Sequence, residues 1–217
     1  MKKIAFIITT LLCIYLIYVE LYKNKINYVS INDSYGIKLN YNEYLKKIIT
    51  NDKRLGTYNI SFSNSTIYNV YQDVVNNRTL RVDNNDYYLK KVLRESDLLV
   101  INVGMEELAL NFDKYNIDRN GTYFDKMYTD IEYLIQEIKK YAYGKIVFIG
   151  YYNPTNYYDS KIDEFFYKIN VKLSKLMNLS NILYLDMYKL AKENNNISYN
   201  IATNIYAMYN NYWNNHY

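Results

Sequence analysis

The stretch LLVINVG, Leu98 to Gly104, decides the fold that this sequence predicts. It is a short, uninterrupted apolar run that ends at a glycine, which is typical of a strand buried on both faces of a parallel sheet. A second run of this kind, KIVFIGY, extends from Lys145 to Tyr151 and is closed by Asn153-Pro154. The long segment between the two runs leaves room for the helical crossover that parallel strands require.

Helical periodicity fills the segments around these two strands. Asn120-Gly121 marks a turn before a long amphipathic helix that reaches about Tyr141. Shorter patterns predict helices over 42–49, 66–75, 86–94, 162–177 and 203–213, and strands over 28–31, 57–62 and 182–185. The alternation predicts an α/β fold, a three-layer α/β/α sandwich with about five parallel strands.

The composition is that of one globular domain. The chain has 217 residues, of which 50% are hydrophobic and 22% charged. Thirty tyrosines stand against six glycines and one proline, which indicates either an AT-rich genome or a tyrosine-coated surface for carbohydrate. Beyond residue 25 the chain has 22 basic and 21 acidic residues without a basic stripe, so we expect no nucleic-acid binding.

The N-terminus carries a targeting signal. Lys2 and Lys3 precede an uncharged apolar run of 16 residues, Ile4 to Val19, somewhat shorter than the roughly 20 of a full span. Positive charge before such a run directs the following chain outward. The pattern predicts a membrane helix over 1–22, an uncleaved single-pass signal anchor, with an extracytoplasmic domain over 26–217.

Three other interpretations of this segment stay open. Bulky residues fill 15–19, which argues against signal cleavage, although a cleaved peptide would leave a secreted protein. A buried helix is the second alternative. A lipid-modified Cys13 is the third, but Thr10-Leu11-Leu12 lacks the small residues expected before a lipidated cysteine. Cys13 is the single cysteine, so no internal disulfide forms.

The loops after the predicted strands are where a site is expected. In open parallel sheets, ligands bind outside the carboxyl ends of the strands. This rule selects the segments 32–36, 63–66, 104–107 and 151–155.

These loops resemble blocks of the SGNH/GDSL hydrolases. VSINDS, Val29 to Ser34, resembles the strand and Gly-Asp-Ser turn that opens that family, with Asn32, a residue that tolerates left-handed backbone, in place of the glycine. LLVINVGMEEL, Leu98 to Leu108, is similar to the third block, a strand ending in Gly-x-Asn-(Asp/Glu)-Leu. IVFIGYYNPT, from Ile146, resembles the next strand and loop. The blocks occur in family order over roughly residues 27–213.

The resemblance implies a flavodoxin-like sandwich that hydrolyses esters with a serine nucleophile. Ser34 takes the nucleophile position, and its own N–H, a second-block glycine and a third-block asparagine would bind the oxyanion. The glycine position falls near Asn64, and the asparagine position is Glu106, beside Gly104. Asp33, Glu107 and Asn153 are the remaining residues expected in the cleft loops.

Several parts of this machinery do not match. A carboxylate at Glu106 has no proton to donate to an oxyanion. The C-terminal Asp and His positions align with Asn200 and Ala202, and the one histidine, His216, follows the last predicted helix. A tail that folds back to supply His216, or a glutamate acting as the base, stays open as a replacement.

Structural interpretations stand beside these functional ones. Asp33 and Ser34 would also cap a helix or shape a turn, and Glu106 and Glu107 would be solvated residues at a helix start. Asp186 is interpreted as a strand-end cap or a partner for Ser34. No metal-ligand spacing occurs, so no metal or cofactor is predicted.

Two functional hypotheses follow. The first is an SGNH-type hydrolase acting outside the membrane on an envelope ester, an acetylated glycan or a lipid. The second is a non-catalytic relative that binds envelope glycan or a protein partner.

Overall fold

The computed structural model describes residues 2–23, 25–52, 54–62, 65–82, 85–111, 122–153, 160–193 and 196–216. At its centre lies a five-stranded parallel sheet in the order β2-β1-β5-β6-β7. The strands are β1 (Lys25–Asn32), β2 (Arg54–Ser61), β5 (Leu98–Asn102), β6 (Lys145–Ile149) and β7 (Leu183–Leu185). The α/β class and the parallel sheet expected from the apolar runs are confirmed.

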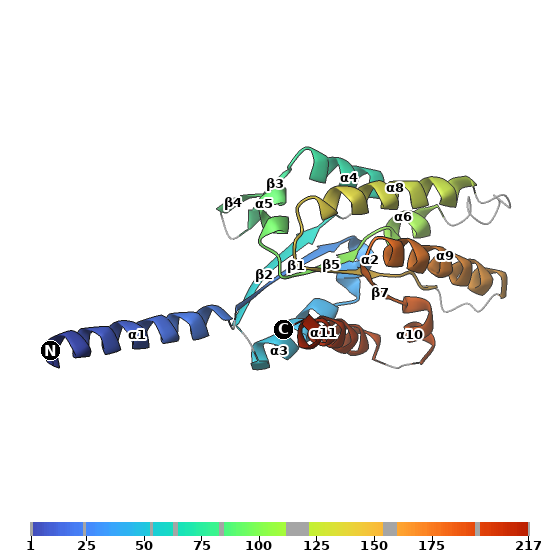
Figure 1. Cartoon of the computed structure of the whole chain (residues 1–217). Coiled ribbons are helices and arrows are strands. Elements are labelled where there is room, and N and C mark those ends of the chain that lie inside the picture. Colours follow the sequence, from blue (N-terminus) through green and yellow to red (C-terminus); the bar gives the residue numbers. More distant parts are fainter. Residues whose placement is uncertain are drawn as a thin grey trace.

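Helices cover both faces of the sheet, which completes the three layers (Figure 1). The first face carries α4 (Ile67–Val75), α5 (Leu89–Arg94), α8 (Thr122–Lys139) and α9 (Ser160–Leu179). The second face carries α3 (Tyr41–Asp52), α10 (Met187–Glu193) and α11 (Ile197–His216).

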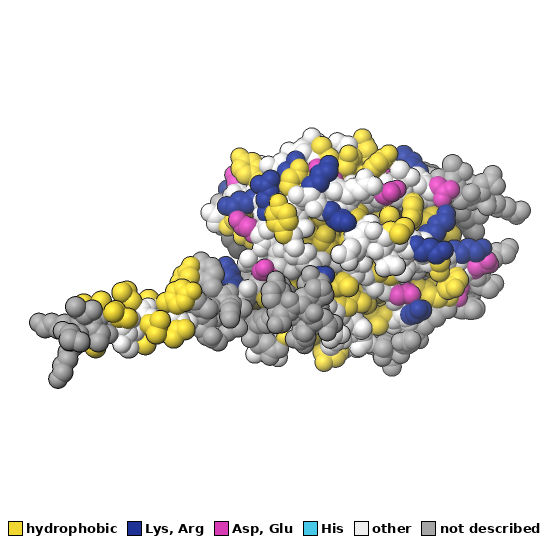
Figure 2. Space-filling model, viewed as in Figure 1, with side chains coloured by type: hydrophobic (Ala, Val, Ile, Leu, Met, Phe, Trp, Pro, Cys, Tyr) yellow, Lys and Arg dark blue, Asp and Glu magenta, His cyan; other side chains and the backbone are white. Residues whose placement is uncertain are grey.

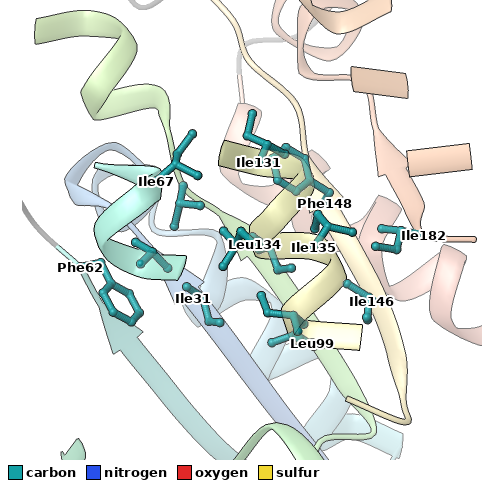
Figure 3. Close-up of a cluster of buried hydrophobic side chains, with 14 of the residues drawn as sticks. Ile31, Phe62, Ile67, Leu99, Ile131, Leu134, Ile135, Ile146, Phe148 and Ile182 are labelled. Carbon is teal, nitrogen blue, oxygen red and sulfur yellow. The ribbon is translucent and has the colours of Figure 1, made fainter. Parts of the chain in front are cut away.

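Alternating side chains of each strand supply two separate cores. Leu99 and Ile101 of β5 point into the first core, whereas Leu98 and Val100 point into the second. Figure 3 shows the first core, where Leu99 and the β6 residues face Leu134 of α8. Burying each such aliphatic side chain stabilises the fold by about 1.5–3 kcal/mol. A strand buried on both sides must therefore be apolar throughout, as the run from Leu98 is.

A β-hairpin replaces part of one predicted helix. The sequence pattern placed a helix over 86–94 with Asp86 as its N-cap, but α5 begins only at Leu89. Asp86 lies in β4 (Asn85–Tyr88), which pairs antiparallel with β3 (Thr79–Val82). Tyr87 of this hairpin packs edge-on against Tyr58 at 5.2 Å between ring centroids, a tertiary contact that local propensity does not register.

The C-terminal helix is longer than predicted. The sequence placed its start near Thr203, whereas α11 begins at Ile197 and continues to His216. Both Asn200 and Ala202 therefore lie inside the helix, not in the loop before it. The short helix α10 was not predicted.

The N-terminal helix α1 (Lys2–Lys23) projects away from the sandwich (Figures 1 and 2). Its large apolar side chains from Phe6 to Tyr18 are 54–74% exposed. Within the described residues, however, no helix meets the combined length and apolarity expected of a membrane span. The membrane role of residues 1–22 stays a prediction.

Candidate functional site

Two strand ends bring the predicted site residues together. Asn32, the last residue of β1, is in register with Asn102, the last residue of β5. Directly beyond them begin α2 (Ser34–Lys38) and α6 (Met105–Leu110) (Figure 1). Because the strands are parallel, both helices start at the carboxyl edge of the sheet. The Ser34 turn and the Gly104 turn are therefore neighbours, as the sequence predicted.

Asp33 caps the N-termini of both short helices. Its Oδ1 accepts the Gly36 N–H at 2.9 Å within α2, and its Oδ2 accepts the Glu106 N–H at 2.9 Å in α6. The N-cap of α6 is Gly104, which has no side chain, so Asp33 supplies that acceptor from across the site. Burial raises the pKa of the Asp33 carboxyl, while the two backbone donors oppose that rise.

Glu106 in turn caps the N-terminus of α2. Its Oε2 accepts the backbone N–H of Ser34 at 3.2 Å, at the first position of α2. The Glu106 side chain was expected to be solvated, but the residue is only 6% exposed. The SGNH resemblance assigns this same Ser34 N–H to the oxyanion. A carboxylate oxygen of the protein thus occupies a donor that an ester would need.

Glu107 has a structural role on the neighbouring helix. Its Oε2 accepts the Ile67 N–H at 2.8 Å and so caps α4 beside Thr66, whose hydroxyl accepts the Asn69 N–H. The residue is only 9% exposed, so the expectation of a solvated Glu107 is also wrong. Burial raises the pKa of its carboxyl, the Ile67 N–H lowers it, and the charge of Asp130 raises it further.

A network of polar side chains supports the Ser34 turn at the ends of β1 and β2. Asn59 Oδ1 accepts from Asn32 Nδ2 at 2.9 Å and from the Ser30 hydroxyl at 2.8 Å. The Tyr41 hydroxyl donates to Asn32 Oδ1 at 2.7 Å. Asn32 therefore anchors the extended end of β1, where the resemblance had suggested only tolerance of a left-handed backbone. No sequence pattern indicated Ser30, Asn59 and Tyr41, because their roles arise only when β1, β2 and α3 pack together.

Tyrosines pack beside the Gly104 turn. Gly104 has φ +100°, and a Cβ there would lie 2.2 Å from the Tyr151 hydroxyl, so glycine is required. That hydroxyl donates to the Val103 carbonyl at 2.9 Å. Burial raises the pKa of the adjacent Tyr152, and the nearby Tyr35 phenol and Asp33 carboxylate add to the shift. Tyr35 and Tyr152 lie in the selected segments 32–36 and 151–155, but the sequence did not single them out as site residues.

Both predicted triad positions lie within α11. Ala202 is fully buried in the second core, and Asn200 forms part of the first turns of α11. Within the described part of the chain, no hydrogen bond is found for the Ser34 hydroxyl.

His216 lies at the C-terminal end of α11, whereas the start of that helix contacts the end of α2. Ser198, near the start of that helix, donates to the Leu39 carbonyl at the end of α2. At about 1.5 Å per residue, the helix carries His216 about 27 Å beyond Ser198. Figure 1 accordingly places the C-terminus near the end of the sheet where α1 attaches. The alternative of a tail folded back to supply His216 is not seen, because the chain stays helical through His216.

The remaining predicted residues have separate outcomes. Asp186 Oδ1 accepts the Lys189 N–H at 3.2 Å, which fits the strand-end cap interpretation. Asn153 is half-buried at the same edge of the sheet as Ser34. Asn64 and Pro154 lie outside the described residues. Among the described residues, no group of three or more His, Cys, Asp or Glu gathers as metal ligands would, and the absence of a metal stays a prediction.

Known structures share this fold. A lipase from a goat rumen metagenome superposes with a TM-score of 0.63 at 12% identity, covering 77% of this chain and 83% of the lipase. An acetylxylan esterase from Geobacillus stearothermophilus superposes with a TM-score of 0.56 at 11% identity, covering 78% and 81%. The chain therefore has an SGNH/GDSL hydrolase-like fold.

Sequence comparisons add no nearer relative. No protein-family model matches the chain. No curated protein matches it either.

Proposed function

We propose that this chain is an SGNH-fold domain that binds an envelope glycan, including its acetylated forms, without hydrolysing it by a serine mechanism. We further propose that α1 tethers the domain to the outer face of the cell membrane. The observation that carries the first proposal is the hydrogen bond from the Ser34 N–H to Glu106 Oε2.

The Glu106 carboxylate opposes ester hydrolysis in two ways. It occupies the Ser34 N–H, and its negative charge would repel the oxyanion that forms when serine attacks an ester. Removing a single oxyanion donor costs hydrolases about 100–1,000-fold in rate. Replacing that donor by a buried anion is more severe, because attraction becomes repulsion.

Within the part of the chain that the structure describes, no hydrogen bond joins the Ser34 hydroxyl to a base, which also opposes a serine mechanism. Serine requires a group that takes its proton, and the one histidine of the sequence lies at the far end of α11. Two carboxylates lie next to Ser34, Asp33 in the chain and Glu106 through its hydrogen bond, and both already accept backbone N–H groups as caps. A fixed cap is a poor proton acceptor for the hydroxyl beside it.

A carbohydrate ligand is favoured by the tyrosines of this edge. Tyr35 and Tyr152 lie close to Asp33 at the ends of the strands, where open α/β sheets bind ligands. Aromatic faces with a polar hydroxyl suit the mixed apolar and polar surface of a sugar. The structurally similar acetylxylan esterase acts, by its name, on an acetylated glycan, and this is the reason to begin with that ligand class.

The tether rests on the N-terminal helix. The uncharged run from Ile4 to Val19 follows Lys2 and Lys3, an arrangement that places the following domain outside the membrane. The large side chains between Phe6 and Tyr18 of α1 are apolar and exposed, so they need an apolar environment.

An ester hydrolase is the second candidate. Ser34 stands at the first position of α2, directly after β1, the position that the resemblance gives to the nucleophile. This candidate requires Glu106 to leave the Ser34 N–H when an ester binds.

Titration of the full chain in nanodiscs with acetylated and deacetylated xylo-oligosaccharides tests the proposal. We expect calorimetric binding, weakened at least severalfold in Tyr152→Ala, and no acetate release above the rate of Ser34→Ala. Tyr167→Ala, a change at an exposed tyrosine on α9, is the control and should bind normally. Acetate release that disappears in Ser34→Ala would replace this proposal with the hydrolase.

A further inference from the structure

The edge of the sheet opposite the Ser34 turn carries a second surface of unusual composition. The amino ends of β5, β6 and β7 surround a cavity of about 430 Å³. We define the amino-edge surface by Leu179, which directly precedes Ser180 in the chain, and by five residues that line the cavity: Arg94, Lys139, Tyr143, Lys145 and Ser180. None of them takes part in the site at the carboxyl edge.

Two apolar side chains stand out from this surface. Leu179, at the end of α9, is 87% exposed, and Tyr143, in the turn before β6, is 79% exposed. Among the large hydrophobic side chains that the structure describes, these two exposures are the highest. A single exposed apolar side chain is ordinary, but here two lie with cations at one edge of the domain.

Cations flank the two apolar side chains. Arg94 and Lys139 are exposed, and within the described residues no ion pair joins either of them to a carboxylate. The Lys139 ammonium instead donates to the Ser180 carbonyl at 2.6 Å, which holds it beside Leu179.

The acidic residues that line the same cavity are engaged elsewhere. Asp97 accepts the Asn27 N–H at 2.7 Å, and Glu95 pairs with Lys91 at 3.8 Å. Both carboxylates keep their charge, but the cavity is lined by three basic residues (Arg94, Lys139 and Lys145) against these two acidic ones, which leaves a net charge of 3 − 2 = +1.

The helix α1 leaves the domain from this same edge. It ends at Lys23, and β1 begins at Lys25, so α1 joins the sheet at the amino end of β1 (Figure 1). All five strands are parallel, which places the amino ends of β5, β6 and β7 on the side from which α1 extends.

We propose that the amino-edge surface rests on a phospholipid bilayer that contains anionic lipid. Leu179 and Tyr143 enter the interfacial layer, and Arg94 and Lys139 contact the lipid phosphates. This inference relies on the tether proposed for α1, which brings the surface to the membrane. It also gives the domain a fixed orientation, with the Ser34 turn facing away from the bilayer.

The test uses the full chain with Cys13→Ser, reconstituted in nanodiscs and carrying a spin label at Leu179→Cys. The control label is Leu110→Cys at the end of α6, where the native leucine is 73% exposed near the carboxyl edge. In nanodiscs that contain phosphatidylglycerol, the label at 179 should become accessible to oxygen and shielded from a water-soluble nickel complex. The label at 110 should stay accessible to the nickel complex.

The charge of the surface is tested by Arg94→Glu with Lys139→Glu. Each lost cation should lower the population of molecules whose amino-edge surface contacts the membrane about fivefold, because each basic residue near an anionic surface adds to the attraction. Lys168→Glu with Lys172→Glu on α9 removes the same charge elsewhere and should leave the label at 179 shielded.

Three results would overturn the inference. The first is equal accessibility of the labels at 179 and 110 to the nickel complex in anionic nanodiscs. In that case the tether by α1 would still hold. The second is shielding of the label at 179 in detergent solution, without a bilayer, that appears only when the chain self-associates. A second copy of the chain would then cover the surface. The third is failure of the full chain to incorporate into nanodiscs, which removes the tether as well.

Discussion

The backbone N–H of Ser34 donates to Glu106 Oε2 at 3.2 Å, across the gap between the ends of two neighbouring strands. The return bond, from the Glu106 N–H to Asp33 Oδ2, makes this a reciprocal arrangement in which each helix start holds the other. The same contact that stabilises the edge of the sheet occupies the donor that a serine hydrolase would keep open. The Ser34 N–H therefore cannot donate to Glu106 and to an oxyanion at the same time.

Asp33→Ala tests the shared cap. The substitution leaves the N–H groups of Gly36 and Glu106 without their acceptor, and we expect a loss of about 2 kcal/mol or more in the free energy of unfolding. Asp33→Asn keeps one amide oxygen and should fall between Ala and the wild type. Asp73→Ala, which breaks an exposed pair with Arg78, should cost about 0–1 kcal/mol. Urea unfolding followed by circular dichroism measures all three, and equal losses for Asp33→Ala and Asp73→Ala would contradict the shared cap.

Glu107 makes stability depend on pH. Burial raises the pKa of its carboxyl above the ordinary value of 4.5, so the native state holds this proton more tightly than the unfolded state. Its contribution to stability therefore decreases as pH rises from 4.5 through the raised native pKa. Glu107→Gln, which still accepts the Ile67 N–H, should flatten this part of the stability profile.

Glu107→Ala separates the titration from the hydrogen bond. It removes the same titrating group but leaves the Ile67 N–H unsatisfied, at a cost of about 1–3 kcal/mol. Unfolding midpoints measured from about pH 4 to about pH 8 compare the two variants. A Gln variant with an unchanged slope would refute the role of Glu107.

Gly104→Ala should be strongly destabilising. The residue has a left-handed backbone, and the new Cβ would meet the Tyr151 hydroxyl at 2.2 Å. Left-handed strain and overpacking together predict a loss of about 3 kcal/mol. Gly56→Ala is the control, because its Cβ would meet only the movable side-chain oxygen of Asn27 at 2.7 Å. Thermal unfolding that shows Gly56 to be the more sensitive position would contradict the requirement for glycine at Gly104.

Much of the fold could be predicted because its strands are buried on both faces. A strand such as Leu98–Asn102 must be apolar at every position, so its sequence identifies it without any tertiary information. The β3–β4 hairpin could not be predicted in this way. Its residues from Asn85 to Tyr88 are half-buried or exposed, and a contact with Tyr58 on a distant strand decides their conformation.

The candidate site was predictable in position but not in detail. The rule that sites gather at the carboxyl ends of parallel strands brought Ser34, Gly104 and Glu106 together correctly. The burial of Glu106 and Glu107 was missed, because acidic residues at a helix start are usually solvated and only the packed structure shows which N–H groups they cap. Tyr35 and Tyr152 were missed because tyrosine is so frequent in this sequence that single tyrosines carry little information.

The reactivity of Ser34 toward a fluorophosphonate, measured by intact-protein mass spectrometry on the folded full chain, tests the central claim most directly. Phosphonylation requires an activated serine hydroxyl and an open oxyanion site, so we expect no adduct in the wild type, in Ser34→Ala or in Glu106→Asn, which opens the N–H but adds no base. A stoichiometric adduct on the wild type that is lost in Ser34→Ala would show that Glu106 yields the site and that the chain is an active serine hydrolase.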